Sequence, residues 1–310
     1  MNPETPYKLS DQEMEICHQL ISKTETAFAD PRQSGYFVKT AGVTENGDIV
    51  TGGNKENSLS DAFVHGETAV ISRIRDQYGE VAIKAIGFYQ EGDVSEENIS
   101  PCGACRDVLI QQTSPELLLM SGNKNKIVVL KLRDFIFEDF HEIMPTDLDS
   151  IGVKQAIIAL NKGIDEYLPK NLKRKVYGVS IIDQNGKNYR GSLYTNAGYD
   201  AITPGLAAVQ TWVNSDVNKR CNIDKIVIVS KSEIPSPFYR DRQALLELAE
   251  VTYQKKVRVE LIQLDNSDNI LKVATTDTNE WLPRPFSALS FGMHDLIQSQ
   301  HNKMFAKLSI

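Results

Sequence analysis

Residues 65–67 read His-Gly-Glu, and residues 101–106, further along the chain, read Pro-Cys-Gly-Ala-Cys-Arg. One histidine and two cysteines are three zinc ligands, and since zinc usually takes four, the fourth position is left to water. Such an open position is typical of catalytic rather than structural zinc sites. His65, Cys102 and Cys105 are therefore the predicted ligands of one zinc ion per chain.

Glu67 lies two residues after the histidine, and its carboxyl group is not needed as a ligand. Hydrolysis by a metal-bound water requires three proton transfers: one from the attacking water, one to the substrate and one to the leaving group. One carboxyl group beside the metal can make all three transfers, and general acid–base catalysis of this kind contributes roughly 10²- to 10⁴-fold in rate. We expect Glu67 to be this proton shuttle.

The spacing of the two predicted cysteine ligands suits a metal centre at the start of a helix. Residues three apart lie on one helical face, and the free N–H groups and positive dipole end of the first turn favour thiolates. A Cys-x-x-Cys pair on its own also occurs in redox centres and structural zinc sites. A structural site would need a fourth ligand, for which Cys17, His18 and His141 are the candidates. Otherwise Cys17 and Cys221 are expected to be small buried hydrophobic residues.

The composition is that of a soluble two-domain enzyme. At 310 residues the chain is long enough for two domains, each with a core of its own. The polar start MNPETPYKLSDQEME has no signal-peptide pattern, and four cysteines are not a disulfide framework. No apolar run approaches the roughly 20 residues of a membrane span, so we expect a cytoplasmic protein. The 34 basic and 41 acidic residues give a formal net charge of −7, which argues against nucleic acid as a partner.

The second half of the sequence repeats the first. Asn46-Gly47 corresponds to Asn185-Gly186, and Ala69-Val70 to Ala208-Val209, at a constant offset of 139 residues (185 − 46). Further matches at this offset are Gly52 with Gly191, Asn57 with Asn196, Asp61-Ala62 with Asp200-Ala201 and Gly66 with Gly205. Later, at an offset of 136 residues (237 − 101), Pro101, Arg106 and Leu109 correspond to Pro237, Arg242 and Leu245. We interpret the second half as a copy of the first.

The copy has lost the predicted chemistry. The residues that stand in place of His65, Glu67 and the two cysteine ligands are Pro204, Leu206, Phe238 and Asp241. Because turn glycines and apolar positions are kept while all four reactive residues are gone, the second half is expected to keep the fold without catalysis. We therefore expect a catalytic zinc-binding domain over residues 1–150 and a degenerate, non-catalytic domain over residues 151–310.

Each half is predicted to be an α/β domain in which helices cover a mixed sheet. In the first half, the apolar patterns predict helices over residues 10–29, 65–78, 102–112 and 133–143, and strands over residues 37–44, 48–53, 82–90 and 126–132. The spacing of Ser10 and Glu13 is that of a capping box, and Asn46-Gly47 is a strong hairpin signal. The predicted ligands thus lie at two helix N-termini. A polar linker is expected near residues 145–152.

With these motifs the chain resembles the cytidine deaminase family of zinc enzymes over most of both halves. His-x-Glu followed by Pro-Cys-x-x-Cys is the signature of zinc-dependent nucleobase deaminases, and GGNKEN at residues 52–57 resembles the family's ribose-binding segment. A degenerate second half, with histidine as the first ligand, resembles the larger bacterial and plant type, in which two-domain chains form a homodimer. The resemblance implies two tandem cytidine-deaminase-like α/β/α domains and the deamination of cytidine or deoxycytidine in pyrimidine salvage.

The resemblance also implies how a nucleoside would be held. Asn54 and Glu56 would bind the 3′-hydroxyl group of the sugar. The backbone of Gly66 would address the pyrimidine carbonyl group, and the carbonyl oxygen of Ser100 would receive the amine.

An aromatic side chain, either Tyr36 or Phe37, would pack on the pyrimidine ring by the same resemblance. The sequence departs from the family pattern at Gly66, Lys55 and Asp107, where alanine, a small apolar residue and glutamine are usual. These departures leave the metal chemistry unchanged, but pocket shape selects the substrate. The reaction is therefore defined more closely than the nucleoside.

The motifs are compatible with three classes of protein: a nucleoside deaminase, a polynucleotide-editing deaminase and a zinc-stabilised binding protein without catalysis. Glu56 favours the first over the second, because a phosphate on the 3′-oxygen would remove the donated proton and put an anion beside a carboxylate. Within the first class, a modified or antibiotic cytosine nucleoside is the alternative substrate. The expected partners are a small-molecule nucleoside and a second copy of the chain, without nucleic acid or membrane.

Overall fold

The computed structural model describes residues 2–57, 63–92, 94–95, 99–137, 141–143, 150–164, 176–195, 201–216, 221–285, 287 and 293–305. The chain divides into two compact units, Met1–Ile136 and Phe137–Ile310. The expected domain boundary after residue 150 falls inside the second unit, because the strand β6 (His141–Ile143) pairs with β13 (Ile270–Asp277) of that unit. Among the described helices, none combines the length and the apolar character that a membrane crossing requires.

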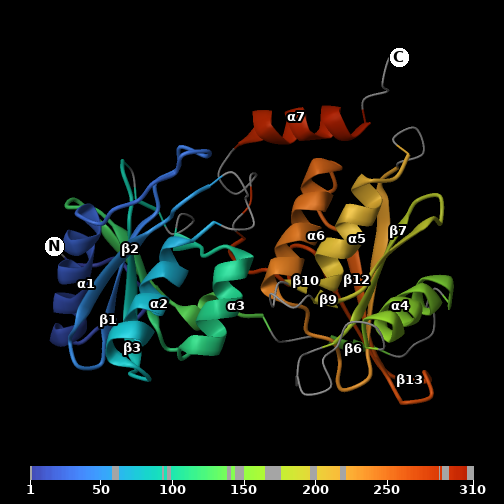
Figure 1. The fold of residues 1–310 in the computed structure, drawn as a ribbon, viewed down its shortest axis with the longest axis horizontal. Helices are drawn as coiled ribbons and strands as arrows, with labels where there is room; N and C mark the ends of the chain where they lie inside the picture. The colour runs from blue at the N-terminus through green and yellow to red at the C-terminus, as the bar shows by residue number, and fades with distance from the viewer. Residues whose placement is uncertain are drawn as a thin grey trace. The chain divides into compact units, whose positions relative to one another are not determined.

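The first unit is built on a five-stranded mixed sheet (Figure 1). In pairing order the strands are β2 (Ile49–Gly53), β1 (Lys39–Thr44), β3 (Ile83–Tyr89), β4 (Leu118–Gly122) and β5 (Ile127–Lys131). β3 and β4 run parallel, and the other neighbours run antiparallel. Parallel neighbours need a crossover connection, and α3 (Gly103–Gln112) lies in the connection from β3 to β4.

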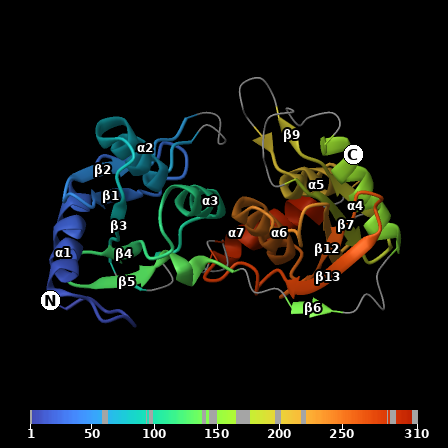
Figure 2. The same cartoon turned by 90° about the horizontal axis from the view of Figure 1, so that it is seen from below.

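Helices cover both faces of this sheet. Successive strand residues point to opposite faces, and Ala41 and Val43 of β1 pack with Leu20 of α1 (Asp11–Glu25). Val70 and Ile74 of α2 (Gly66–Tyr78) belong to a second hydrophobic cluster on the other face. Figure 2 shows α1 and α3 on opposite sides of the strands. The mixed sheet covered by helices, as predicted, is confirmed.

Two local signals in the sequence have the expected structural role. The Ser10 hydroxyl group accepts from the backbone N–H of Glu13 (3.2 Å), and the Glu13 carboxylate accepts from the backbone N–H of Ser10 (2.7 Å), which completes the capping box of α1. Gly47, in the turn between β1 and β2, adopts a φ of +90°, a conformation that glycine reaches without steric cost.

The second unit contains a six-stranded mixed sheet. In pairing order the strands are β6, β13, β12 (Arg258–Leu264), β11 (Ile223–Ser230), β7 (Gly178–Asp183) and β8 (Asn188–Gly191). A two-stranded sheet is formed by β9 (Tyr194–Thr195) and β10 (Ala201–Ile202). The helices are α4 (Ser150–Lys162), α5 (Pro204–Val213), α6 (Tyr239–Val251) and α7 (His294–Phe305).

The two units share one sheet topology. The order β8-β7-β11-β12-β13 in the second unit corresponds to β2-β1-β3-β4-β5 in the first. In each sheet the only parallel pair among the described strands is the equivalent one, β11 with β12 or β3 with β4. The internal repeat predicted from the sequence is therefore present in the fold, with β6 as an additional strand.

Two elements of the first half differ from the prediction. The helix predicted over residues 133–143 is wrong, because Leu132–Phe135 form a single 3₁₀ turn and His141–Ile143 form β6. β4 was not predicted, since all of its residues are buried and a short strand buried on both faces shows no alternation. The predicted linker near residues 145–152 lies largely outside the described residues, and α4 begins at Ser150.

Candidate active site

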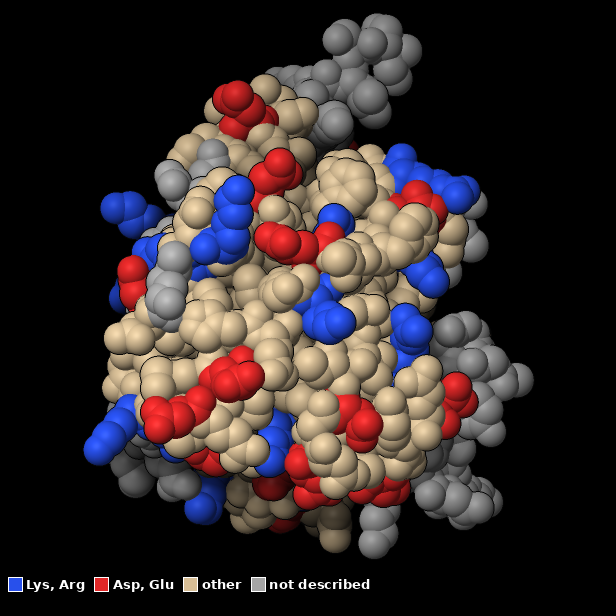
Figure 3. Space-filling view, turned by 90° about the vertical axis from the view of Figure 1, so that its left-hand side faces the viewer, with Lys and Arg blue, Asp and Glu red and all other residues tan. Residues whose placement is uncertain are grey.

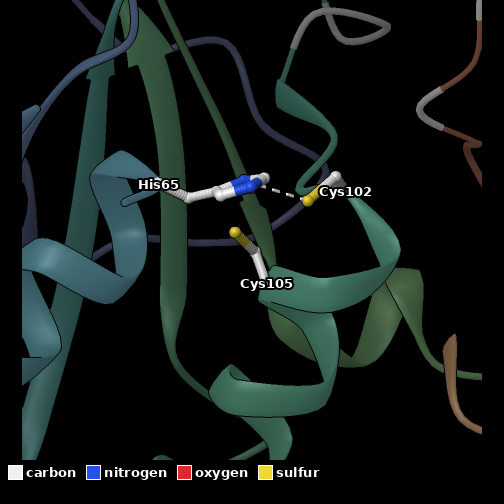
Figure 4. A group of neighbouring side chains, drawn as sticks. All are labelled: His65, Cys102 and Cys105. Carbon is white, nitrogen blue, oxygen red and sulfur yellow. Dashed lines mark hydrogen bonds between the residues drawn. The ribbon is translucent and has the colours of Figure 1, made fainter. Parts of the chain in front are cut away.

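The three predicted zinc ligands lie at the starts of two helices. His65 directly precedes α2 and Cys102 directly precedes α3, both with extended backbone, and Cys105 lies in the first turn of α3. Their ligand atoms all lie within 4.8 Å of one another, and Cys102 Sγ is 3.4 Å from His65 Nδ1. Figure 4 shows the imidazole and both thiol groups converging on one point. The structure thus brings the three residues together.

This donor set fits zinc, because imidazole nitrogen and thiolate sulfur are its usual protein donors. No fourth His, Cys, Asp or Glu joins the group among the described residues. Cys17 lies in the hydrophobic cluster under α1, and His18 is exposed on that helix. The side chain of His141 lies outside the described part of the structure. Three protein ligands leave one coordination position open, as a catalytic site requires.

The site favours a thiolate at Cys102. The hydrogen bond from Cys105 holds the pKa of Cys102 well below its ordinary value, and His65 adds to this lowering, although burial opposes it. The same hydrogen bond, together with burial, raises the pKa of Cys105. A lowered pKa favours the thiolate, which is the form that binds a metal ion.

Glu67 lies in the first turn of α2, with 6% of its surface exposed. Burial raises the pKa of its carboxyl group to about 7, and the negative charge of Cys102 acts in the same direction. A carboxyl group with this pKa can take up and release a proton near neutral pH, as general acid–base catalysis requires. A carboxyl group suited to proton exchange therefore lies two residues from the predicted ligand His65.

Asn54 and Glu56 lie side by side at the end of β2 and hold the loop that precedes β1. The side-chain oxygen of Asn54 accepts from Val38 N (3.0 Å), and its amide nitrogen donates to Tyr36 O (2.9 Å). The Glu56 carboxylate accepts from the backbone N–H groups of Gln33 and Ser34 (both 2.8 Å) and from the Ser34 hydroxyl group (2.6 Å). The sequence predicted neither these contacts nor the part that Gln33 and Ser34 play in them.

The hydrogen bonds to Glu56 also set its ionisation. Burial alone would raise the pKa of Glu56, but the bonds from Ser34, Gln33 and Asn54 outweigh burial and lower it. Glu56 is therefore ionised in the folded protein. Its negative charge is used to order the loop.

That loop carries the two predicted aromatic residues. Tyr36 and Phe37 are 48% and 60% exposed. Burial of the Tyr36 hydroxyl group and the charge of Glu67 raise the pKa of Tyr36, so this phenol lies within electrostatic reach of the candidate acid. The charge of Glu67 thus relates the phenol of Tyr36 to the candidate acid, whereas Phe37 has no ionisable group that could show the same effect.

Arg106 has a role that its place in the motif did not reveal. Its fully buried guanidinium group donates to Pro101 O (2.9 Å), Ser100 Oγ (2.8 Å) and Phe135 O (3.1 Å). It therefore fixes the turn that carries Ser100 and leads into α3. The signal available in the sequence is the same Ser-Pro-x-x-x-x-Arg spacing at residues 236–242.

Residues 12–121 match the family model described as the cytidine and deoxycytidylate deaminase zinc-binding region. The match covers most of the first unit. Both motifs, at residues 65–67 and 101–106, lie within the match. The resemblance seen in the sequence is thereby confirmed.

Similarity to individual cytidine deaminases extends over more of the chain. A cytidine deaminase of Haemophilus influenzae (strain 86-028NP) is 24% identical over 246 residues, which are 74% of this chain and 75% of that protein. The crystal structure of cytidine deaminase from Burkholderia pseudomallei is 28% identical and covers 40% of this chain and 98% of its own, with a TM-score of 0.33. The crystal structure of the Mycobacterium tuberculosis enzyme is 24% identical, covering 41% of this chain and 94% of its own, with a TM-score of 0.32.

The second unit lacks the ligand set of the deaminase domain. Among its described residues, no three His, Cys, Asp or Glu side chains lie close enough to hold a metal ion. Asp241, at the position of Cys105, is fully buried and accepts from Gly205 N (2.7 Å), Leu206 N (3.1 Å) and Tyr177 Oη (2.6 Å), and also from Thr203 Oγ1. A carboxylate on α6 thus caps the start of α5. The starts of α5 and α6 correspond to those of α2 and α3, which carry the predicted ligands in the first unit.

Proposed function

We propose that the chain is a zinc-dependent deaminase that converts cytidine or deoxycytidine and water to uridine or deoxyuridine and ammonia. The observation that carries this proposal is the convergence of His65, Cys102 and Cys105 beside the buried carboxyl group of Glu67. The Haemophilus influenzae relatives are named cytidine deaminases, which supports the same reaction. Such an enzyme would act in pyrimidine salvage in the cytoplasm.

When held by these three ligands, zinc would make a water molecule nucleophilic near neutral pH. Glu67 would accept one proton from the attacking water and donate it to the ring nitrogen next to the carbon that carries the amine. It would then transfer the second proton of that water to the amine, which leaves as ammonia when the C–N bond breaks. One water is consumed and one ammonia released, and the carboxyl group returns to its starting state.

The base would be oriented by groups that surround the two helix starts. Gly66 is the first residue of α2, so its backbone N–H group belongs to the first turn, where N–H groups have no partner within the helix. We assign this N–H group to the pyrimidine carbonyl oxygen, and the carbonyl oxygen of Ser100 to the amine. Either Tyr36 or Phe37 would pack on the ring, and the phenol of Tyr36 lies within electrostatic reach of Glu67.

The sugar would be recognised at Asn54 and Glu56. Both side chains are at most 9% exposed and already hold the loop before β1, which supports a rigid site for the 3′-hydroxyl group. The alternative is that they act only by ordering this loop. Glu56→Ala should penalise cytidine much more than 3′-deoxycytidine if the hydroxyl group is bound, and both substrates equally if the loop alone matters.

A polynucleotide substrate is disfavoured by charge. The face shown in Figure 3 intersperses Lys and Arg with Asp and Glu and has no continuous basic track for a phosphate backbone. Glu56 would in addition repel a 3′-phosphate group. A modified or antibiotic cytosine nucleoside is the remaining alternative substrate.

An ultraviolet assay of zinc-loaded protein tests the proposal. The panel comprises cytidine, deoxycytidine, 5-methylcytidine, cytidine monophosphate and a cytosine-containing single-stranded oligonucleotide, with ammonia measured in parallel. We expect loss of the cytosine absorbance and release of ammonia from the nucleosides only. Turnover of the oligonucleotide would identify an editing enzyme, and the absence of ammonia from every substrate would leave a zinc-stabilised binding protein.

The assignment of the two halves is part of the proposal. We assign catalysis to the first half, residues 1–150, and an architectural role to the second, residues 151–310, within a homodimer that carries one zinc ion per chain. The absence of a ligand set among the described residues of the second unit supports this assignment.

A further inference from the structure

Thr40, in β1, has a fully buried side chain whose hydroxyl group has no hydrogen-bond partner among the described residues. A buried polar group without a partner destabilises a fold, and valine would fill the same volume without that cost. Thr40 faces α2, since Gly42, two residues along the strand, lies against Val70 of that helix. The Thr40 side chain therefore lies directly beneath the helix that begins at the candidate active site.

The atoms of Thr40 lie against Gly66, the residue between the ligand His65 and the acid Glu67. A Cβ atom at Gly66 would lie 2.8 Å from Thr40 Cγ2 and 2.9 Å from Thr40 Oγ1. Carbon atoms in van der Waals contact lie about 3.5–4.0 Å apart. Only a residue without a Cβ atom fits between the strand and this turn as they stand.

The body of α2 has no room to move away from the sheet without loss of packing. A Cβ atom at Gly42 would lie 2.5 Å from Val70 Cγ1, and one at Gly52 would lie 3.0 Å from Val70 Cγ2. The helix is thus seated closely on glycines of two strands at its centre. A steric change at its N-terminus would have to be absorbed by Thr40, by Val38, whose Cγ1 would lie 3.1 Å from a Cβ atom at Gly66, or by the His65-Gly66-Glu67 turn itself.

We propose that Thr40 and Gly66 form a size-matched pair that positions the His65-Gly66-Glu67 turn. Thr40 is then a positioning residue for the deamination. This inference rests on the proposed function. The turn carries a metal ligand, a backbone N–H group for the pyrimidine and the proton shuttle, so a shift in it moves all three. A misplacement of 1 Å can cost about 10²-fold in rate. The pair is specific to the first unit, because Val179 stands at the position of Thr40 in the repeat and Gly205 lies against Asp241 instead.

A double-mutant cycle tests the pair in the full-length, zinc-loaded protein. Gly66→Ala should lower kcat/KM for cytidine at least tenfold, mainly through kcat, and Thr40→Ala should lower it only a few-fold. The double variant Gly66→Ala/Thr40→Ala should recover most of the loss caused by Gly66→Ala, with a coupling of about fivefold or more. Losses that multiply, or a Gly66→Ala variant with normal kinetics, would overturn the proposal.

Two matched variants separate positioning from general damage. Gly205→Ala introduces a Cβ atom 2.5 Å from Asp241 Cγ in the second unit, so it should lower the thermal midpoint without changing kcat/KM. Thr40→Val keeps the volume and removes the hydroxyl group. If size is what matters, Thr40→Val should raise the thermal midpoint and preserve the kinetics, whereas a loss of rate would assign the role to the hydroxyl group and contradict a pair matched by size.

The double-mutant cycle can also be measured without an activity assay. The thermal midpoint and the zinc content of the four proteins should show the same rescue, because the clash displaces a ligand-bearing turn. If wild-type protein releases no ammonia from any nucleoside but the rescue of stability and zinc content is seen, the proposed function fails and the pair stands. If activity is present and neither quantity is rescued, the pair fails and the function stands.

Discussion

Arg106 and Arg242 lie at equivalent positions of the two units and share three corresponding hydrogen bonds, to which Arg242 Nη1 adds one to Phe137 O. In each, Nε donates to the carbonyl oxygen of a proline, Pro101 or Pro237, and Nη2 donates to the hydroxyl group of the preceding serine, Ser100 or Ser236. In each, Nη1 donates to a further backbone carbonyl group, that of Phe135 or Trp281. The arrangement is kept in a unit whose described residues contain no ligand set, so its first role is to stabilise the fold.

This pair of arginines gives a control for catalysis within one chain. Lysine has a compact charge and cannot reproduce the planar fork of donors, so Arg106→Lys and Arg242→Lys should lower the thermal midpoint by similar amounts. Only Arg106→Lys should also lower kcat/KM, by about tenfold or more, because it loosens the turn that carries Ser100. Thermal unfolding and steady-state kinetics of both variants check this. If Arg106 had only a structural role, the Arg106→Lys and Arg242→Lys variants would have the same kcat/KM.

Glu67 is expected to act on protons and not on the metal. Glu67→Gln should lower kcat by about 10²-fold or more while the protein keeps its zinc. Cys102→Ala should lose zinc and local stability, because a ligand is gone. Metal analysis beside an activity assay distinguishes the two effects. Zinc loss in Glu67→Gln, or a near-normal rate, would falsify the assignment.

Glu56 makes the loop before β1 sensitive to acid. Its pKa is lower in the folded protein than in the unfolded chain, so the carboxylate contributes stability above the unfolded pKa, and the contribution is lost as pH falls through the folded pKa. The thermal midpoint of Glu56→Gln should therefore lie below that of the wild type at neutral pH, and the gap should close under acidic conditions, below about pH 4. A gap that is independent of pH would show that the charge is not what orders the loop.

Asp241 should stabilise the second unit independently of zinc. The carboxylate accepts from four donors. Asparagine would turn its N–H₂ group toward the backbone N–H group of Gly205 or Leu206, and a buried donor left unpaired costs about 1–3 kcal/mol. In Asp241→Asn, hydrogen exchange should quicken in peptides spanning residues 203–209 and not in those spanning 65–71. A zinc chelator should instead quicken exchange in peptides spanning residues 65–71 and not in those spanning residues 203–209. If either treatment changed exchange equally in the two segments, Asp241 would not stabilise the second unit independently of zinc.

The ligand set and its two helices could be predicted because zinc chemistry restricts both residue type and spacing. α2 and α3 begin one residue after the predicted starts at residues 65 and 102. His65 and Cys102 directly precede these helices, and Cys105 lies in the first turn of α3. Repetition of the turn glycines also revealed the second fold.

The remaining features depend on distances across the fold. Glu56 finds its donors at Gln33 and Ser34, more than 20 residues earlier, and no short motif encodes that contact. Thr40 meets Gly66 only because β1 lies beneath α2. β4, buried on both faces, lacked the alternation by which strands are recognised.

The last prediction concerns why the second unit persists. It retains a large apolar core, including the fully buried Trp212 and Trp281, yet its described residues contain no metal cluster. A domain that keeps its packing surfaces without its chemistry is best explained if those surfaces complete an assembly, and two-fold dimers are the commonest closed form. Residues 1–136 alone should therefore be poorly soluble or inactive, although every proposed catalytic residue lies within them, and the full chain should be dimeric by light scattering with one zinc ion each. A monomeric, fully active fragment, or two zinc ions per chain, would show that the second unit serves another purpose.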